Sequence, residues 1–262
     1  MKTDQFVLIT ERFTLNPLTQ GDAPLLAELG SDPDVVKPLI CDWSTPSKRM
    51  KIAKYWIEIY QEYGIWGVFD RQGIFGNPGQ MIGFCAADGP LPLGGKGPEI
   101  FYAFSRETWG HGVGTEVARV VIDYLFQELG VGAVEALVFA GLNPASGRLL
   151  EKLGMSIIGT YPLANYIGEE CDPTIEYELW RVKNSPAENG RMNLEEAAFK
   201  IGQFVGEDMA SEETMSASLM KAATENNHLA SENEETLNRL INNSLIAGMA
   251  EKGWLHYRIE KS

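Results

Sequence analysis

Hydrophobic residues in the first half of the chain follow two periods, and each period predicts one kind of element. Alternation in VLITERFTL, residues 7–15, predicts a strand, and QGDAPLLAELGSD after it predicts a short helix with acidic residues near its start. A longer amphipathic helix is expected over 46–63, where apolar residues return every three or four positions: Ile52, Trp56, Ile59 and Tyr63. Strands are then expected from Ile65, Gln80 and Glu99, with PLPLGGKGP as a loop between the last two.

The second half alternates between the two patterns. A helix is expected to end near Gly130, followed by a strand over 134–140, a helix over 144–153 and strands over 155–161 and 175–182. Strands that alternate with helices predict an α/β, or α+β, fold with a mixed central sheet whose faces are covered by helices.

The composition changes at KNSPAENGRMN, residues 183–193, a polar stretch that is typical of a linker. Beyond it the pattern is helical over 194–205, 211–225 and 232–251, and the chain ends in the strand-like WLHYRI. We therefore expect one α/β domain over 1–183, a linker over 184–192 and a helical extension over 193–262. The extension is expected either to bind a partner or to form a homodimer through its helices.

The chain is acidic, with 22 Lys and Arg residues against 36 Asp and Glu residues and a formal charge of −14. Lys and Arg residues do not cluster along the chain, so a nucleic-acid partner is not expected. The negative electrostatic field of the protein favours a partner that carries an amine. Cysteines and histidines, three of each, have spacings that argue against a disulfide framework and against a metal site. Because neither an export signal nor a long apolar run is found, we expect a cytoplasmic protein without a membrane span.

The stretch WGHGVGT, from Trp109 to Thr115, places three glycines in five positions just before an amphipathic helix. Glycine allows positive φ and lets a ligand approach main-chain N–H groups without meeting a Cβ atom. A helix N-terminus adds unpaired N–H donors and the positive end of the helix dipole. These features predict a phosphate site for a diffusible ligand, since the stretch itself has no Lys or Arg.

Two well-known phosphate motifs do not fit this stretch. Thr115 and Glu116 follow Gly114, so the lysine of a P-loop is missing, and Val117 stands where a dinucleotide fingerprint needs its third glycine. A plain tight turn before a helix is the alternative to a phosphate site.

The surroundings favour the phosphate site. The strand EIFYAF, the stretch WGHGVGTE with its helix, the strand VEALVFA and then NPASGRLLEKLGM together resemble the GNAT superfamily of acyl-CoA transferases. More narrowly, they are similar to the RimJ and RimL branch of ribosomal-protein N-acetyltransferases, which has Trp-Gly-x-Gly-x-x-Thr-Glu, then Asn-x-x-Ser and Glu-Lys-Leu-Gly. The resemblance extends over about residues 5–182 and includes ITERFTLNPLTQGD near the N-terminus.

The resemblance implies a GNAT fold with two splayed parallel strands, and acetyl-CoA or another acyl-CoA as the cofactor. The stretch before the helix would bind the coenzyme A pyrophosphate through main-chain N–H groups, and the pantetheine arm would pair with exposed main-chain groups of the preceding strand. The implied cofactor-binding residues are Tyr102, Phe104, Trp109, Gly110, His111, Gly112, Val113, Gly114, Thr115, Asn143 and Ser146. For the His111 side chain itself, a solvent-facing position is expected.

Acyl transfer to an amine requires a neutral amine, a stabilised oxyanion and a proton for the leaving thiolate. The resemblance implies Glu99 as the base, Ser146 as the proton donor or a pantetheine ligand, and Asn143 as a residue that orients the cofactor or a bound water. Two of these have a structural alternative. Glu99 could be a solvated carboxylate at a strand edge, and Asn143 is a good N-cap for the helix that begins at Pro144.

One departure from the branch bears on the base. Where the branch has Glu-Tyr-Leu-Asn-Gly, this chain reads NYIGE, so Asn165 stands at the place of a glutamate that is thought to assist the base. An amide cannot accept the proton, and Glu169, Glu170 and Asp172 are the nearby carboxylates that could replace the glutamate. Trp66, on a strand that leads to the site, is the candidate for lining an acceptor pocket.

These observations predict direct transfer of an acetyl or longer acyl group from acyl-CoA to a primary amine, without a covalent enzyme intermediate. A peptide or protein amine ranks above a small-molecule amine, because the open cleft of the branch and the helical extension suit a larger acceptor. The alternative is a catalytically silent CoA-binding sensor or scaffold that binds proteins through its helical extension. The sequence does not identify the acceptor, the acyl chain or the oligomeric state.

Overall fold

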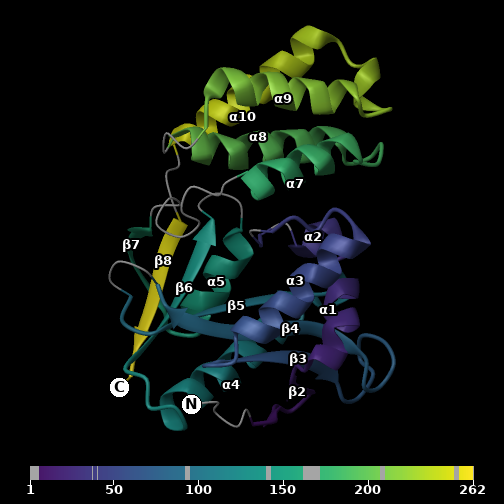
Figure 1. Cartoon of the computed structure of the whole chain (residues 1–262). Helices are drawn as coiled ribbons and strands as arrows, with labels where there is room; N and C mark the ends of the chain where they lie inside the picture. Colours follow the sequence, from purple (N-terminus) through teal and green to yellow (C-terminus); the bar gives the residue numbers. More distant parts are fainter. Residues whose placement is uncertain are drawn as a thin grey trace.

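The fold combines a mixed sheet, helices on both of its faces and a further layer of helices at one end (Figure 1). The computed structural model describes residues 6–36, 38–39, 41–91, 95–139, 143–161, 172–206, 210–250 and 254–261. Its strands are β1 (Leu8–Ile9), β2 (Phe13–Pro17), β3 (Gly64–Asp70), β4 (Met81–Pro90), β5 (Pro98–Phe104), β6 (Ala133–Phe139), β7 (Ser156–Tyr161) and β8 (Trp254–Glu260). Its α-helices are α1 (Ala23–Leu29), α2 (Pro33–Val36), α3 (Pro46–Ile59), α4 (Val113–Gln127), α5 (Pro144–Lys152), α7 (Asp172–Lys183), α8 (Gly190–Gly206), α9 (Glu212–Thr224) and α10 (Glu234–Ala250). Short 3-10 helices are η1 (Gln20–Asp22), η2 (Arg106–Thr108) and η3 (Leu229–Ser231).

The sheet joins the described strands in the order β1-β2-β3-β4-β5-β6-β8-β7. Neighbouring strands run antiparallel except β5 and β6, which are parallel. Among the described residues, β5 and β6 pair only at Glu99 and Glu135, near the start of each strand. The two strands therefore separate toward their carboxyl ends, which is the splay that the resemblance implies.

Alternation along β5 assigns its side chains to two different cores. Ile100 and Phe104 pack in a core with α4 and α5, whereas Ala103 and Phe101 pack on the opposite face with α1, α2 and α3. Trp56 lies in this second core, as expected, with its ring centroid 5.2 Å from that of Trp43. The helices thus cover both faces of the sheet.

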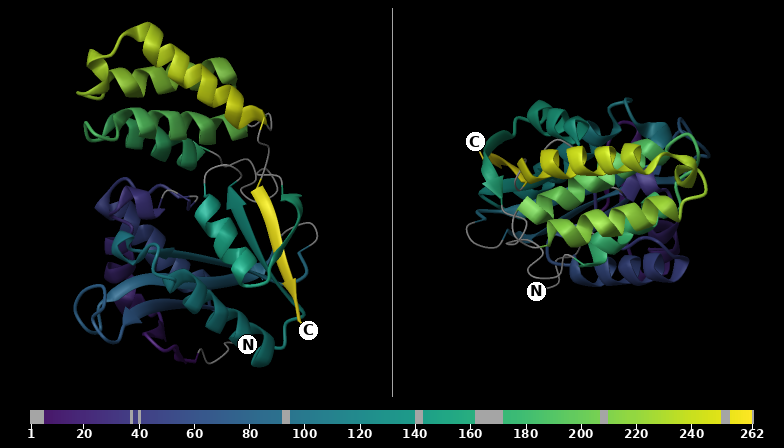
Figure 2. Two further views of the ribbon diagram at one scale, coloured as in Figure 1. Left: turned by 180° about the vertical axis from the view of Figure 1, so that it is seen from behind. Right: turned by 90° about the horizontal axis from the view of Figure 1, so that it is seen from above.

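Helices α7 to α10 form a layer beyond the carboxyl end of β6, which we call the helical layer (Figures 1 and 2). Its core includes Leu194, Ile201 and Phe204 of α8, and it reaches the sheet through Phe139 of β6 and Trp254 of β8. In chain order the layer lies between β7 and β8, because the chain returns from α10 to insert β8 between β6 and β7.

Some expectations from the sequence differ from the structure. Residues 7–15 do not form one strand, because β1 and β2 pair as a hairpin whose turn is closed by the Thr10 N–H donating to the Phe13 carbonyl (2.9 Å). Residues 175–182 are helical in α7, where the buried Ile175, Glu178 and Val182 recur at helical spacing. The expected linker over 184–192 is shorter, since α8 already begins at Gly190.

The C-terminal residues 254–260, which were assigned with the helical extension, are a strand of the sheet. The other predicted helices and strands are present within a few residues of their expected bounds, and the predicted mixed central sheet is confirmed. Among the residues that the structure describes, no helix combines the length and the apolar composition needed to cross a bilayer.

Candidate active site

A cavity of about 440 Å³ is lined by the carboxyl ends of β5 and β6, where the two strands separate. The stretch before α4 with the first turn of that helix, one side of α5 and residues in and just after α2 complete its lining. The predicted cofactor-binding residues that line it are Tyr102, Phe104, Trp109, Gly110, Gly112, Val113, Gly114, Thr115, Asn143 and Ser146. The structure therefore brings together all of the predicted set except His111.

Residues 109–115, which we call the glycine loop, present main-chain donors at the N-terminus of α4. Gly110 and Gly112 have φ angles of 80° and 76°, in the left-handed region that favours glycine. Within the described part of the chain, several N–H groups of the loop donate to no acceptor: those of Gly110, Gly112, Val113, Gly114 and Thr115. A Cβ atom at Gly110 would meet nothing within 4 Å, so the space above the loop is open. The loop is therefore not a turn closed by its own hydrogen bonds.

Arg12 braces the glycine loop from the N-terminal hairpin. Its Nη1 donates to the His111 carbonyl (3.1 Å), and its Nε donates to Glu116 Oε2 (2.7 Å) in the first turn of α4. Burial alone would raise the pKa of Glu116, but hydrogen bonds from Thr10 and Arg12 hold that pKa below its ordinary value. Because Arg12 neutralises it, Glu116 does not leave an unbalanced negative charge beside the loop. Arg12 was missed by sequence reasoning.

Two basic side chains of α5, Arg148 and Lys152, also line the cavity. They are four residues apart, so they lie on one side of the helix. Sequence reasoning looked for a basic residue only inside the loop and missed both. The signal that could have found them is their spacing along the helix that begins after Asn143.

Main-chain groups of β5 face the separating strand β6. The Ser105 N–H donates to the Ile82 carbonyl of β4 (2.9 Å), so ladder alternation places the main-chain groups of Tyr102 and Phe104 on the β6 side. The Phe104 carbonyl already accepts from Trp109 Nε1 (2.8 Å). Tyr102 and Phe104 are the residues predicted to pair with a pantetheine arm. At Phe104 the main-chain N–H group is therefore the one left for this pairing.

Two hydroxyl groups meet across the cavity. The Oη atom of Tyr102 lies 2.8 Å from Ser146 Oγ, and either hydroxyl can be the donor. Burial raises the pKa of Tyr102 above its ordinary value, so this hydroxyl keeps its proton at neutral pH. Asn143 Oδ1 accepts from the Ser146 N–H (3.1 Å), which confirms Asn143 as the N-cap of α5 while it also lines the cavity.

Glu99 does not line this cavity, because it lies on the other face of β5. It is 4% exposed, so its alternative as a solvated carboxylate is wrong. Its ladder neighbours are Asp88 on β4 and Glu135 on β6. Burial, and to a smaller extent the acidic groups Asp88 and Glu99, raises the pKa of Tyr60, which follows α3 on that face of the sheet.

Two candidates from the sequence lie away from the site. Trp66 is fully buried in the core, where its Nε1 donates to the Phe6 carbonyl (3.0 Å) and its ring packs against Tyr124, so it cannot line an acceptor pocket. His111 is exposed and packs its ring against Phe75 (5.3 Å between centroids), while its N–H donates to Thr108. The solvent-facing expectation for its side chain is confirmed.

The candidates for the second carboxylate fall largely outside the described residues. Asn165, Glu169 and Glu170 lie in the segment 162–171, which the structure does not describe. Asp172 is the first residue of α7, and the structure does not describe its side chain. The roles expected for them stay predictions.

Comparison with known proteins identifies one family. A family model described as "Acetyltransferase (GNAT) domain" matches residues 12–156. The chain is 32% identical over 155 residues to the uncharacterized protein YkkB of Bacillus subtilis (strain 168), a match that covers 56% of this chain and 84% of YkkB. It is 31% identical over 172 residues to the uncharacterized N-acetyltransferase YoaA of the same organism, covering 64% of this chain and 91% of YoaA.

Among solved structures, the chain is similar to RimL, a ribosomal-protein alpha-N-acetyltransferase whose structure contains coenzyme A. The TM-score is 0.50 at 14% identity, over 62% of this chain and 90% of RimL. At this identity the likeness shows the fold alone. The family match ends at the first residue of β7, before the helical layer begins.

Proposed function

The chain belongs to the GNAT acetyltransferase family, and from this premise we propose that it transfers an acetyl group from acetyl-CoA to a primary amine. The observation that carries the proposal is the row of N–H groups in the glycine loop that donate to no acceptor within the described residues, on residues that line the cavity between two splayed strands. Acetyl-CoA would supply an activated acyl group, as a thioester with a thiolate leaving group.

The donors of the cavity fit the phosphates of such a cofactor. Free N–H groups at the N-terminus of α4 and the positive end of its helix dipole favour an anion. Arg148 and Lys152 line the same cavity and add two positive charges. Gly110 and Gly112 keep the approach to the N–H groups free of Cβ atoms.

The hydroxyl pair of Tyr102 and Ser146 can supply the proton that a leaving thiolate needs. The two oxygens are 2.8 Å apart, so one hydroxyl can donate outward while its partner replaces the proton. The raised pKa of Tyr102 keeps the pair protonated at neutral pH. Asn143 holds the first turn of α5, and with it Ser146, through its capping hydrogen bond.

Glu99 is the proposed base, acting from the other face of β5. A lysine-type amine has a pKa of about 10.4 and a polypeptide α-amine one of about 7.7–8.0, so both are mostly protonated at neutral pH and a carboxylate or a water chain must remove the proton. Glu99 and Tyr102 lie on opposite faces of the strand. The amine would therefore approach from the side of α3 and Tyr60, while the thiol end of the cofactor lies on the side of α5.

The acceptor is proposed only as a class, a primary amine of a peptide, a protein or a small molecule. RimL, which shares the fold, acts on a ribosomal protein, and this supports a polypeptide amine as the first class to test. Family membership does not favour the alternative of a silent CoA-binding scaffold. A cytoplasmic location and a homodimer through the C-terminal helices stay predictions.

Two measurements test the proposal. Calorimetry with coenzyme A and acetyl-CoA should show saturable binding, and intact mass spectrometry of peptide and amine libraries after incubation with acetyl-CoA should show an added acetyl group. Ser146→Ala and Glu99→Gln should bind coenzyme A and slow transfer, by at least about tenfold for the base. An absence of heat with both ligands would refute the proposal.

A further inference from the structure

The helical layer touches the wall of the cavity at Phe139. This residue ends β6, lines the cavity, and is 4% exposed. Behind the cavity its ring packs in the core of the helical layer, with its centroid 4.6 Å from that of Trp254. The ammonium group of Lys200 on α8 lies 5.0 Å from the same centroid, in a cation–π arrangement.

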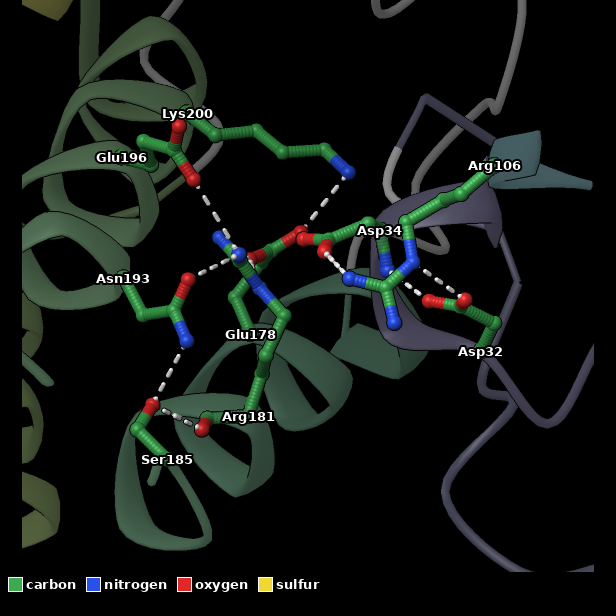
Figure 3. A network of polar contacts seen from close by, with 9 residues as sticks. All are labelled: Asp32, Asp34, Arg106, Glu178, Arg181, Ser185, Asn193, Glu196 and Lys200. Carbon is green, nitrogen blue, oxygen red and sulfur yellow. Dashed lines mark hydrogen bonds and ion pairs between the residues drawn. The ribbon is translucent and has the colours of Figure 1, made fainter. Parts of the chain in front are cut away.

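Lys200 is itself held by a buried ion network (Figure 3). It is 1% exposed, and its Nζ donates to Glu178 Oε1 of α7 (2.8 Å). The second carboxylate oxygen of Glu178 accepts from Arg181 Nε (2.9 Å), and Arg181 also donates to Asn193 Oδ1 (3.0 Å). Burial alone would raise the pKa of Glu178, but Lys200 and Arg181 hold it below the ordinary value, so the carboxylate stays charged.

The same layer also packs behind a second lining residue of the cavity. Tyr177 of α7, beside Glu178, is 1% exposed and packs in the core that contains Val35, a cavity-lining residue of α2. Figure 3 shows α2 beside this network, with Asp34 bound to Arg106 (2.9 Å). The layer therefore packs with Phe139 in one core and with Val35 in another.

The lining of the cavity contains two kinds of groups. Loop N–H groups, Arg148 and Lys152 suit phosphates, and apolar side chains, among them Val35, Leu149 and Phe139, suit a hydrocarbon chain. An acyl-CoA has phosphates at one end and a hydrocarbon acyl group at the other. Complementarity favours apolar neighbours for the acyl group, and among them Phe139 stands at the end of β6 and is backed by the helical layer.

We propose that Phe139 limits the length of the acyl group, and that Lys200 is a positioning residue that holds the Phe139 ring in place from within the helical layer. This inference rests on the proposed use of acyl-CoA. A ring backed by a buried ion pair and by Trp254 cannot move aside for a longer chain, so the layer sets acyl selectivity without touching the cofactor.

The test compares the dissociation constants of acetyl-CoA and butyryl-CoA, measured by calorimetry on the full-length protein. Phe139→Leu should lower the ratio of butyryl-CoA Kd to acetyl-CoA Kd about fivefold, a change equivalent to about one buried methylene group or a little more. Lys200→Met should lower it in the same direction, about threefold, because the ring loses its support while the cavity lining stays the same. Lys200→Arg should restore the ratio, and Arg191→Met, which removes an exposed ion pair of the same layer, should leave it unchanged.

Each outcome decides between the two roles. A ratio unchanged in Phe139→Leu overturns the acyl limit, and a ratio changed in Phe139→Leu but not in Lys200→Met overturns the positioning role. Because the ratio is taken within one sample, and calorimetric stoichiometry reports the folded fraction, partial unfolding of a variant does not imitate either result. If the unmodified protein binds no coenzyme A, the proposed function itself is refuted. If it binds acetyl-CoA but the variants leave the ratio unchanged, only the inference about Phe139 and Lys200 is refuted.

Discussion

The glycine loop lines the cavity and the helical layer packs behind it at Phe139, and the two regions differ in how they satisfy polar groups. The loop leaves main-chain N–H groups without an acceptor among the described residues, and the residues that carry them line the cavity. The layer buries Glu178, Lys200 and Arg181 and pairs their charges. Unsatisfied donors beside a cavity suit a ligand that arrives and leaves, whereas a closed ion network suits a wall that must not move.

The largest expected effect lies in the helical layer. Glu178→Gln removes the buried carboxylate that Lys200 and Arg181 share and leaves Arg181 with Glu196 (3.2 Å), so we expect the free energy of unfolding to fall by about 3 kcal/mol. Denaturant-induced unfolding followed by circular dichroism measures this change. Glu232→Gln is the matched control, because Glu232 pairs with Arg191 at the exposed surface of the same layer and its loss should have no measurable effect. Equal effects of the two variants on the free energy of unfolding would show that the buried network stabilises the layer no more than an exposed ion pair does.

Next in size is a change in the glycine loop. Gly112→Val forces a β-branched residue into φ of 76°, so the loop must rearrange and its N–H groups no longer converge. Coenzyme A affinity measured by calorimetry should fall by at least about tenfold, with most of the fold retained. Gly132→Val is the control, since Gly132 is not among the positive-φ glycines and a Cβ there would meet nothing within 4 Å. A loss of affinity in the control as well would point to a general effect on folding.

A smaller effect is expected from pH. The pKa of Glu178 is lowered in the folded protein, so its contribution to stability is present above the ordinary Glu pKa of about 4.3 and is lost as pH falls through the lower folded value. The difference in Tm between the unmodified protein and Glu178→Gln should therefore be largest above about pH 5 and shrink below pH 4. Thermal scans at several pH values measure it. A difference that grows on acidification would show that Glu178 is not held in its charged form.

The smallest effect is expected from the basic rim of the cavity. Lys152 is exposed, so Lys152→Met should weaken coenzyme A binding by only about threefold to tenfold, and added salt should reduce the difference. Calorimetry at low and high ionic strength measures both numbers. Lys221→Met, at an exposed position of α9 that does not line the cavity, is the control. A loss that does not depend on salt would indicate a structural role for Lys152.

Much of the site could be predicted from the sequence because its signals are local. The glycines of the loop and the N-cap of α5 are each set by backbone geometry within a few residues. Trp66 could not be placed in this way, since a strand pattern does not tell which face of the sheet is open and which is core. Arg12 was also beyond reach, because its partner Glu116 is 104 residues away.

Local patterns in the chain were enough to predict most helices and strands, the loop before α4 and the family to which residues 12–156 belong. The folded structure was needed to show that residues 175–182 are a helix, that β8 inserts between β6 and β7, and that Lys200 contacts the Phe139 ring. The physical reason is that a hydrophobic period reports which face of an element is buried, but not which other element buries it. Contacts between distant segments depend on how the whole chain packs.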